Sequence, residues 1–280
     1  MSTRINHNIL SLTAQRNIYQ TQGELDTAVT RLSSGLRINN AWDDPAGLAV
    51  SERFRAQIAS MVEAERNANY NVNMMQTAEG ALSVIDEKLI RMRALSVQAS
   101  NGALSTQDRA ALDVEFQQLK SEITRIASTV NYNGNYLLDG TYSGSGAAGM
   151  KFHIGTYNTL NQDYYYVSFN AMTAAALGLT DAALTTTATA QAAILTLDSA
   201  IESKDTERTR MGAYVERLQN TIMNLQISKE SAIRSESEIR DADIAAEMSN
   251  FVRSQILMQT GVAMLSQANM IPQIVAGLVG

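Results

Sequence analysis

The sequence predicts a mainly α-helical fold, a long antiparallel helical bundle or coiled coil formed by the N- and C-terminal segments, with a small β-hairpin region at its centre. Proline occurs only at Pro45 and Pro272, so the long stretch between them contains no strong helix breaker. On both flanks, apolar residues recur with alternating spacings of three and four, which places them on one side of a helix. Residues 131–190 are instead rich in glycine, serine and threonine, so we expect turns and short strands there.

Three apolar stripes predict long packed helices. The first comprises Met75, Ala78, Leu82, Ile85, Leu89 and Met92, the second Leu112, Phe116, Leu119, Ile123, Ile126 and Val130, and the third Met211, Val215, Leu218, Ile222 and Leu225. Between the first two, Asn101-Gly102 is a helix stop signal, and Ser105 stands three residues before Asp108, as in a capping box. We therefore predict an antiparallel helix pair joined near residues 100–105.

Both ends of the chain carry a seven-residue apolar repeat that is typical of a coiled coil. The repeat consists of Ile18, Leu25 and Leu32 near the N-terminus and of Ile244, Phe251, Met258 and Leu265 near the C-terminus. Neither repeat has a partner close by in the sequence, and one apolar stripe buries too little surface to offset the entropy of ordering the backbone. We therefore expect both ends to be largely disordered in the monomer and to fold on association.

The middle segment predicts a hairpin rather than a nucleotide site. Lys151–Ile154 and Tyr164–Phe169 have the composition of strands. Residues 144–149 match the G-x-G-x-x-G spacing of dinucleotide-binding loops. That motif requires a preceding strand and a following helix, whereas here a predicted strand follows, so we interpret the glycines as a loop. A flexible linker between two domains is the less favoured alternative, because the glycine- and serine-rich stretches are short.

Composition and charge exclude several functional classes. The net charge of −6 argues against a general nucleic-acid-binding surface. The absence of cysteine excludes disulfides, thiol catalysis and cysteine-ligated metals, and His7 and His153 are too few for a histidine-rich metal site. No apolar stretch reaches the ~20 residues of a membrane span, and we expect no conventional signal peptide and no membrane insertion.

The remaining candidates for chemistry are two acidic pairs and a basic cluster. The acids at positions 43–44 and 241/243 stand at expected helix starts, so we interpret them as caps. The basic cluster comprises Lys88, Arg91 and Arg93, and cations are favourable near a helix C-terminus. We therefore assign no catalytic, cofactor-binding or metal-binding residue.

Motifs at both ends resemble those of the bacterial flagellin family. Near the N-terminus they are Arg4-Ile5-Asn6-His7-Asn8, Leu32-Ser33-Ser34-Gly35-Leu36-Arg37-Ile38-Asn39, Asp43-Asp44-Pro45-Ala46-Gly47-Leu48-Ala49 and Gln76-Thr77-Ala78-Glu79-Gly80-Ala81-Leu82. Near the C-terminus they are Asp241-Ala242-Asp243-Ile244-Ala245-Ala246-Glu247-Met248, Gln255-Ile256-Leu257 and Ser266-Gln267-Ala268-Asn269. They follow the family's order and extend over residues 1–140 and 195–280.

The resemblance implies a structural subunit of the flagellar filament that serves motility. Such a subunit is exported unfolded through the flagellar type III apparatus, folds on assembly and lies in the extracellular filament. The implied partners are further copies of the chain, the export apparatus, an export chaperone, and the cap and junction proteins. The large variable outer domains of longer relatives are missing from this chain, so we expect a thin filament with a plain surface.

The resemblance also implies a domain map. Residues 1–44 and 239–280 correspond to the two halves of an inner coiled-coil domain, and the heptad residues named above are its expected assembly contacts. Residues 45–138 and 194–238 correspond to the N- and C-terminal parts of an outer rod domain. Residues 139–193 form the turn-rich central segment with the β-hairpin.

Family flagellins are recognised by a Toll-like receptor through the segment that resembles residues 89–98. Arg91, Leu95 and Gln98 match positions used there, and Glu115 on the following helix matches a fourth. The resemblance therefore implies that a host receptor recognises the monomer, because the same positions pack between subunits in the filament.

Two alternatives remain at the level of sequence. The first is a hook–filament junction protein or another axial flagellar protein, which is present in few copies and does not polymerise with itself. The second is a secreted enzyme on a helical scaffold, which requires a catalytic constellation that the sequence does not contain.

Overall fold

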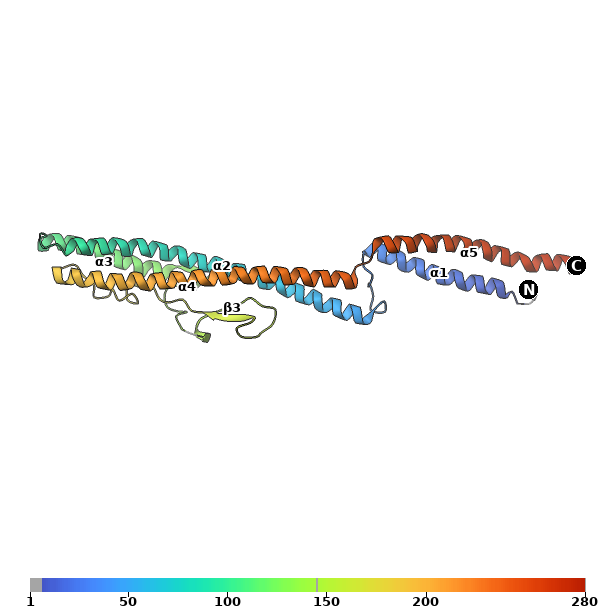
Figure 1. Cartoon of the computed structure of the whole chain (residues 1–280), viewed down its shortest axis with the longest axis horizontal. Helices are drawn as coiled ribbons and strands as arrows, with labels where there is room; N and C mark the ends of the chain where they lie inside the picture. The colour runs from blue at the N-terminus through green and yellow to red at the C-terminus, as the bar shows by residue number, and fades with distance from the viewer. Residues whose placement is uncertain (1–6, 145, 280) are drawn as a thin grey trace. The chain divides into compact units, whose positions relative to one another are not determined.

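The computed structural model describes residues 7–144 and 146–279, with side chains through residue 271. The motif residues at positions 4–6 and 145 lie outside the described residues. The helices are α1 (Ile9–Ser34), α2 (Pro45–Ala99), α3 (Thr106–Thr129), the short 3-10 helix η1 (Gly146–Ala148), α4 (Thr187–Arg240) and α5 (Ile244–Val279). The strands are β1 (Asn131–Tyr132), β2 (Asn135–Tyr136), β3 (Met150–His153) and β4 (Tyr164–Val167). The predicted class, long helices with a small central β region, is confirmed (Figure 1).

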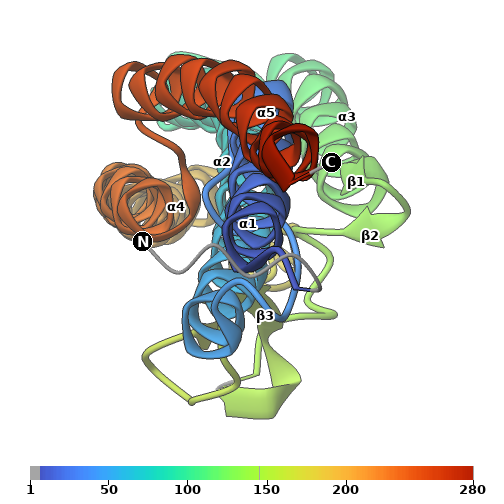
Figure 2. The same ribbon diagram turned by 90° about the vertical axis from the view of Figure 1, so that its right-hand side faces the viewer.

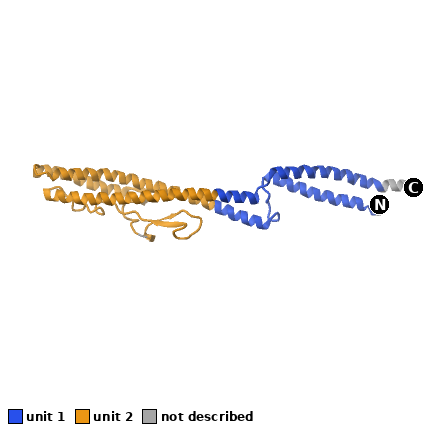
Figure 3. Ribbon diagram, viewed as in Figure 1, with its two compact units in different colours: residues 1–58, 230–280 blue, residues 59–229 orange. Residues whose placement is uncertain are grey.

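The chain divides into two compact units (Figure 3). Unit 1 combines residues 1–58 with residues 230–280, and unit 2 comprises residues 59–229. The helices α2 and α4 therefore each contribute residues to both units.

Unit 2 is a helical bundle with one continuous apolar core. The first predicted stripe is fully buried on α2, and Phe116, Ile123, Met211 and Leu218 of the other two stripes are buried on α3 and α4. Ion pairs between the helices fix their directions. Arg91 on α2 pairs with Glu115 on α3, while Glu79 and Asp86 on α2 pair with Arg208 and Lys204 on α4. Both neighbours of α2 therefore run antiparallel to it.

The predicted turn between α2 and α3 is confirmed. The Ser105 hydroxyl accepts a hydrogen bond from the Asp108 amide (3.2 Å), and the Asp108 carboxylate accepts one from the Ser105 amide (3.0 Å). This capping box satisfies two of the amide groups that a helix start leaves unpaired. Arg109 satisfies the other side of the turn, since its guanidinium donates to the carbonyl oxygens of Ala99 and Asn101, both at 2.9 Å.

Lys204 is an ion embedded in the bundle. Its side chain is 3% exposed, and its ammonium group lies 2.5 Å from the Asp86 carboxylate and 2.6 Å from that of Asp205. Burial opposes the charged form, but the hydrogen bonds to Asp205 and Asp86 outweigh it and raise the pKa of Lys204 above its ordinary value. The pair therefore stabilises the fold at neutral pH and loses that contribution only as the pH rises through the raised pKa.

Two small hairpins follow α3. β1 and β2 pair through the turn at Asn133 and Gly134, which both have positive φ (52° and 84°), as a tight hairpin turn requires. β3 and β4 pair antiparallel with Phe152 opposite Tyr165, which confirms the predicted pair of strands at 151–154 and 164–169. The first strand begins and ends one residue earlier than predicted, and the second ends two residues earlier. Within the glycine motif, residues 146–148 form η1, and β3 follows the motif where a nucleotide loop needs a helix.

In unit 1, α1 and α5 lie side by side, as the two perpendicular views show (Figures 1 and 2). The loop after α1 is tied to the segment before α5 by backbone hydrogen bonds. The Arg37 amide donates to the Arg240 carbonyl (2.7 Å), and the Ala242 amide donates to the Gly35 carbonyl (2.9 Å). Gly35 ends α1 with a φ of 73°, a conformation that favours glycine. The same loop carries Trp42, the single tryptophan of the sequence, which is 80% exposed.

The acidic pairs divide into two roles. Asp44 accepts from the Gly47 amide (2.8 Å) at the start of α2, and Asp243 accepts from the Ala245 amide (2.9 Å) at the start of α5, so these two cap helices as predicted. Asp43 instead accepts from two amides within the loop before α2, and these hydrogen bonds hold its pKa below the ordinary value. Asp241 accepts from the Ser237 hydroxyl (2.6 Å) at the end of α4.

None of the described helices combines the length and the apolar character that a membrane span needs. Among the described residues, no three His, Cys, Asp or Glu side chains are grouped so that they could hold a metal ion.

Replacing Leu82 with alanine should destabilise unit 2, because its side chain is fully buried in the core. We expect L82A to lower the free energy of unfolding by ~2–5 kcal/mol. Urea denaturation followed by far-UV circular dichroism measures the change. The matched control is Val84→Ala on the same helix, whose side chain is 42% exposed. Equal effects of the two substitutions would contradict the assignment of the core face.

Candidate functional site

The pairing of α1 with α5 brings the two ends of the chain together. The Asn8 side-chain amide donates to the Ala268 carbonyl (2.8 Å), and Arg31 pairs with Glu247 (2.9 Å). Between them, a Cβ added to Gly261 would lie only 3.0 Å from the Ile18 Cγ1 atom. Numbers rise along α1 while they fall along α5, so the two helices are antiparallel. The apolar repeat at each end of the chain therefore packs against the repeat at the other end.

Six of the seven predicted assembly residues lie in the contact between α1 and α5. Ile18, Leu25 and Leu32 on α1 and Phe251, Met258 and Leu265 on α5 are each half-buried. Ile244 is 50% exposed at the first turn of α5 and lies outside this contact. Glu247, whose side chain is 13% exposed, takes the corresponding position in the first turn of α5.

Sequence reasoning missed the small residues between the large ones. Serine, alanine, threonine and glycine complete the contact at intermediate spacings, namely Ser11, Ala14, Thr21 and Ala28 on α1 and Ser254, Gly261 and Ala268 on α5. The register places Leu25 opposite Ser254 and Ala28 opposite Phe251, so a large side chain on one helix meets a small one on the other. This complementarity lets the two backbones approach closely. Five of these small residues stand three positions after a residue of the heptad repeat, namely Thr21, Ala28, Ser254, Gly261 and Ala268, so a search at that spacing would have found them.

The surface of α5 away from α1 is strongly apolar. Exposed apolar side chains follow the helix on its other sides, namely Ile244, Met248, Val252, Ile256, Leu257, Val262, Met264, Met270 and Ile271. The helix α1 adds Ile9, Leu10, Leu12, Tyr19 and Val29. We call this set the terminal apolar surface. Polar residues such as Arg253, Gln255 and Gln259 are exposed between them, but apolar side chains are exposed on every side of α5 that α1 leaves uncovered. Exposed apolar side chains in such number are typical of an interaction surface.

The predicted receptor residues lie on α2 and α3 of unit 2. Arg91 and Gln98 are exposed on α2, and Glu115 faces Arg91 from α3. Leu95 is fully buried in the core of unit 2, so its side chain is not part of the surface. The structure therefore places Arg91, Gln98 and Glu115 on one surface of unit 2, whereas Leu95 packs in the core beneath it.

Arg91 and Glu115 form a two-point ion pair. The guanidinium donates to both carboxylate oxygens, from Nε at 2.7 Å and from Nη2 at 3.1 Å. These hydrogen bonds hold the pKa of Glu115 below its ordinary value and raise that of Arg91. The third member of the basic region, Arg93, donates a single hydrogen bond from Nε to Asp198 on α4 (2.6 Å). Both guanidiniums are about half exposed, and each connects α2 to a neighbouring helix. They lie more than one turn before the end of α2, so the expected interaction with a helix C-terminus does not describe them.

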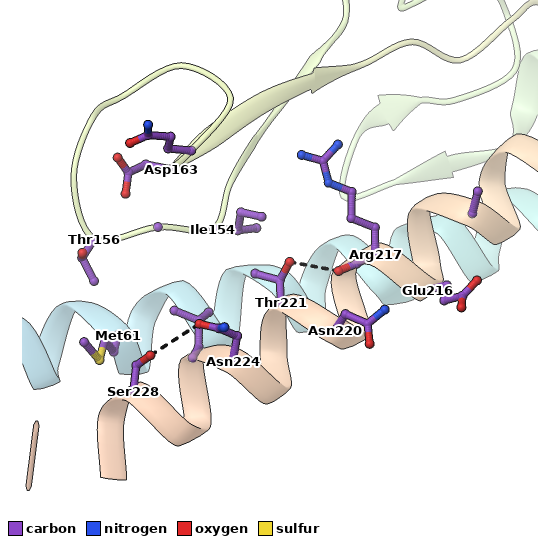
Figure 4. Close-up of a pocket in the computed structure, with 14 residues that line it drawn as sticks. Met61, Ile154, Thr156, Asp163, Glu216, Arg217, Asn220, Thr221, Asn224 and Ser228 are labelled. Atoms are coloured by element: carbon purple, nitrogen blue, oxygen red, sulfur yellow. Dashed lines mark hydrogen bonds between the residues drawn. The ribbon is translucent and has the colours of Figure 1, made fainter. Parts of the chain in front are cut away.

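A polar groove of about 670 Å³ lies between the β3–β4 loop and the helices α2 and α4 (Figure 4). Asp163, which lines it, holds the loop in shape, because its carboxylate accepts from the Tyr157 and Thr159 amides (both 3.0 Å). Arg217 stands on α4 with its guanidinium carbon 4.1 Å from the centre of the Tyr165 ring. Burial raises the pKa of Tyr165 to about 12. The groups at this groove stabilise the hairpin, and their arrangement contains no paired nucleophile and base.

His153, one of the two histidines, also has a structural place. Its ring stacks on Tyr164 of the neighbouring strand, with 6.0 Å between ring centres. It therefore contributes a cross-strand aromatic contact to the β3–β4 hairpin.

Comparison with known proteins gives matches at both ends of the chain. Residues 5–143 match the family model described as the bacterial flagellin N-terminal helical region, and residues 194–279 match that of the bacterial flagellin C-terminal helical region. A flagellin of Halalkalibacterium halodurans is 42% identical over 98% of both chains. The flagellar filament 33 kDa core protein of Treponema phagedenis is 40% identical over 98% of this chain and 99% of its own length.

A solved structure shares the fold at much lower identity. The putative flagellar hook-associated protein from Vibrio parahaemolyticus covers 71% of this chain and all of its own, with a TM-score of 0.58 and 14% identity. At this identity the likeness concerns the fold alone.

Removing Arg91 should raise the pKa of Glu115. A lowered carboxylate pKa means that the pair stabilises the fold above the ordinary pKa of glutamate and loses this contribution as the pH falls through the lowered value. In R91A the pKa of Glu115 should return toward the ordinary value, as measured by NMR titration of its side-chain carboxyl carbon. The control is Arg125→Ala, which removes the partner of Glu122 on the same helix and should shift Glu122 alone. Identical titration of Glu115 in both variants would refute the assignment.

Proposed function

The chain belongs to the bacterial flagellin family and is a structural subunit of the flagellar filament, and from this premise we propose how it assembles. Copies of the chain polymerise through the terminal apolar surface, and α1 and α5 complete their folding as they enter the filament. The single observation that carries this proposal is that α5 exposes apolar side chains on every side that α1 leaves uncovered. Neighbouring copies supply the missing cover, and head-to-tail contacts of this kind extend into a helical polymer rather than closing a dimer.

The small residues of the α1–α5 contact support folding on assembly. Because each large side chain meets a small one, the contact buries little apolar area per residue ordered. Most of the stabilisation of these helices then comes from the surrounding copies. A chain whose ends are unfolded before assembly also suits passage through the flagellar export apparatus, and we propose that apparatus, an export chaperone, and the cap and junction proteins as further partners.

For the functional domains we propose the map implied by the family. Residues 1–44 with 239–280 form the inner coiled coil, residues 45–138 with 194–238 form the rod, and residues 139–193 carry the hairpin. The loop after α1 and the short segment before α5 lie next to the boundaries at 44 and 238, which supports this map. We propose that the subunit acts in the flagellum, outside the cytoplasm, and has no catalytic role, since flagellins are a structural family.

Electron microscopy of the purified chain, concentrated with and without sheared filament seeds, tests the assembly. We expect long uniform filaments, and circular dichroism of the same samples should gain helical signal on polymerisation. The variant E247R places two cations together where Arg31 and Glu247 now pair, so it should not form filaments. The double variant R31E/E247R restores opposite charges and should recover them.

Persistent monomers under all conditions would overturn the proposal and favour the alternative axial role, that of a hook–filament junction protein. Filaments of E247R as abundant as those of the wild type would show instead that the α1–α5 register is not needed for assembly.

We also propose that a host Toll-like receptor recognises the monomer through the face formed by Arg91, Gln98 and Glu115. The ion pair holds the Arg91 guanidinium in a fixed orientation, and Gln98 is exposed two turns further along α2. Leu95 supports the face from within the core. A lysine at position 91 could not hold Glu115 in the same way, because only the planar guanidinium of arginine donates to both carboxylate oxygens in a fixed geometry.

R91A should therefore reduce receptor signalling by the purified monomer, measured in reporter cells that express the receptor. A loss of about tenfold corresponds to one charge-assisted contact. Arg125→Ala, which removes a similar guanidinium from α3, should leave signalling unchanged. Full signalling by R91A would refute this role.

A further inference from the structure

Methionine thioethers are exposed on α5, whereas those of unit 2 are mostly buried. Met248, Met264 and Met270 on α5 are 46%, 59% and 47% exposed. In unit 2 the buried methionines are Met61, Met74, Met75, Met92, Met172 and Met211, and none is more than 6% exposed. Met223 on α4 is 53% exposed and offers an internal comparison.

The three exposed thioethers lie on different sides of α5. Successive residues of a helix are separated by ~100°. Met248 directly follows Glu247 and Met264 directly precedes Leu265, and both of these face α1, so the two methionines flank the contact with α1 on opposite sides. Met270 stands two residues after the buried Ala268 and therefore points away from α1. Any arrangement of copies that surrounds α5 thus buries at least one of these sulfurs.

Oxidation changes the polarity of such a side chain. With no cysteine in the sequence, the accessible thioethers are the groups most readily oxidised by peroxide. The sulfur lone pair attacks one oxygen of hydrogen peroxide, the O–O bond breaks, and that oxygen stays on sulfur as a sulfoxide while the other leaves as water. The sulfur is oxidised, the peroxide is reduced, and a flexible apolar side chain becomes polar.

We propose that Met248, Met264 and Met270 are peroxide-sensitive modification sites of the unassembled chain, and that their oxidation stops the chain from entering the filament. The inference rests on the proposed assembly, because a sulfoxide is harmful only where α5 must be buried by other copies. A sulfoxide oxygen in an apolar contact lacks a hydrogen-bond donor, so its burial is unfavourable. The core of unit 2 shields its buried methionines from peroxide. The exposed methionines of α5 are shielded in this way only when other copies cover the helix in the filament.

The test combines peptide mass spectrometry with seeded elongation. The full-length monomer is treated with hydrogen peroxide and quenched, the oxidation of each methionine is quantified, and the treated chain is added to filament seeds. We expect Met248, Met264 and Met270 to be oxidised and the elongation rate to fall about tenfold or more. Methionine sulfoxide reductase should restore both the thioethers and the rate. Assembled filaments given the same dose should retain the three thioethers.

Leucine substitution isolates the responsible residues, because leucine preserves the volume of methionine and is not oxidised in this way. The variant M248L/M264L/M270L should elongate at the untreated rate after peroxide, whereas M223L should be inhibited like the wild type. Two outcomes overturn the inference alone: normal elongation by a chain oxidised at the three sites, and full inhibition of the triple variant. Failure of the untreated wild type to elongate would overturn the proposed assembly, and this inference with it.

Discussion

The apolar surface of α5 is the constraint on which the rest of the molecule depends. A helix with apolar side chains on every side is stable in water only if every side is covered, and α1 covers one of them. The contact between the two helices is close because Ile18 packs against Gly261 and Leu25 against Ser254. Close approach of this kind fixes the register but buries little area. The ends of the chain are therefore shaped to be completed by other molecules of the same protein.

Unit 2 differs from the terminal helices, because its apolar core is buried within one chain. Leu82, Phe116 and Leu218 come from three helices and are fully buried together. The charged groups between these helices add specificity, since the buried Lys204 ammonium gains a partner on α2 only in the alignment that brings Asp86 within hydrogen-bonding distance. One chain thus combines unit 2, whose core is buried within the chain, with terminal helices that leave many apolar side chains exposed.

The pairing of the two chain ends was implied by the family resemblance. The sequence by itself was sufficient to predict the helical class, the stop at Asn101-Gly102 with its capping box, the two strands around Phe152 and Tyr165, and the apolar repeats of α1 and α5. These features depend on local patterns of period, capping and turn chemistry. Leu95 continues the first stripe three residues after Met92, so periodicity would also have predicted its burial. The exposure of Ile244 and the cross-helix partners of Arg91 and Arg93 depend instead on which faces of distant helices meet. Periodicity does not contain that information, because it identifies a stripe but not the helix that covers it. The small residues of α1 and α5 are visible in the sequence, but only the antiparallel register of the two helices shows that they lie opposite large side chains.

The exposed indole of Trp42 has a consequence for spectroscopy. As the sole tryptophan, and one that stands in the loop between α1 and α2, it makes the long-wavelength fluorescence of the whole protein a signal from a single location. Emission from a solvated indole shifts when neighbouring protein excludes water from the ring. The native chain therefore carries a label in the loop between α1 and α2, and no dye has to be attached to follow what happens there.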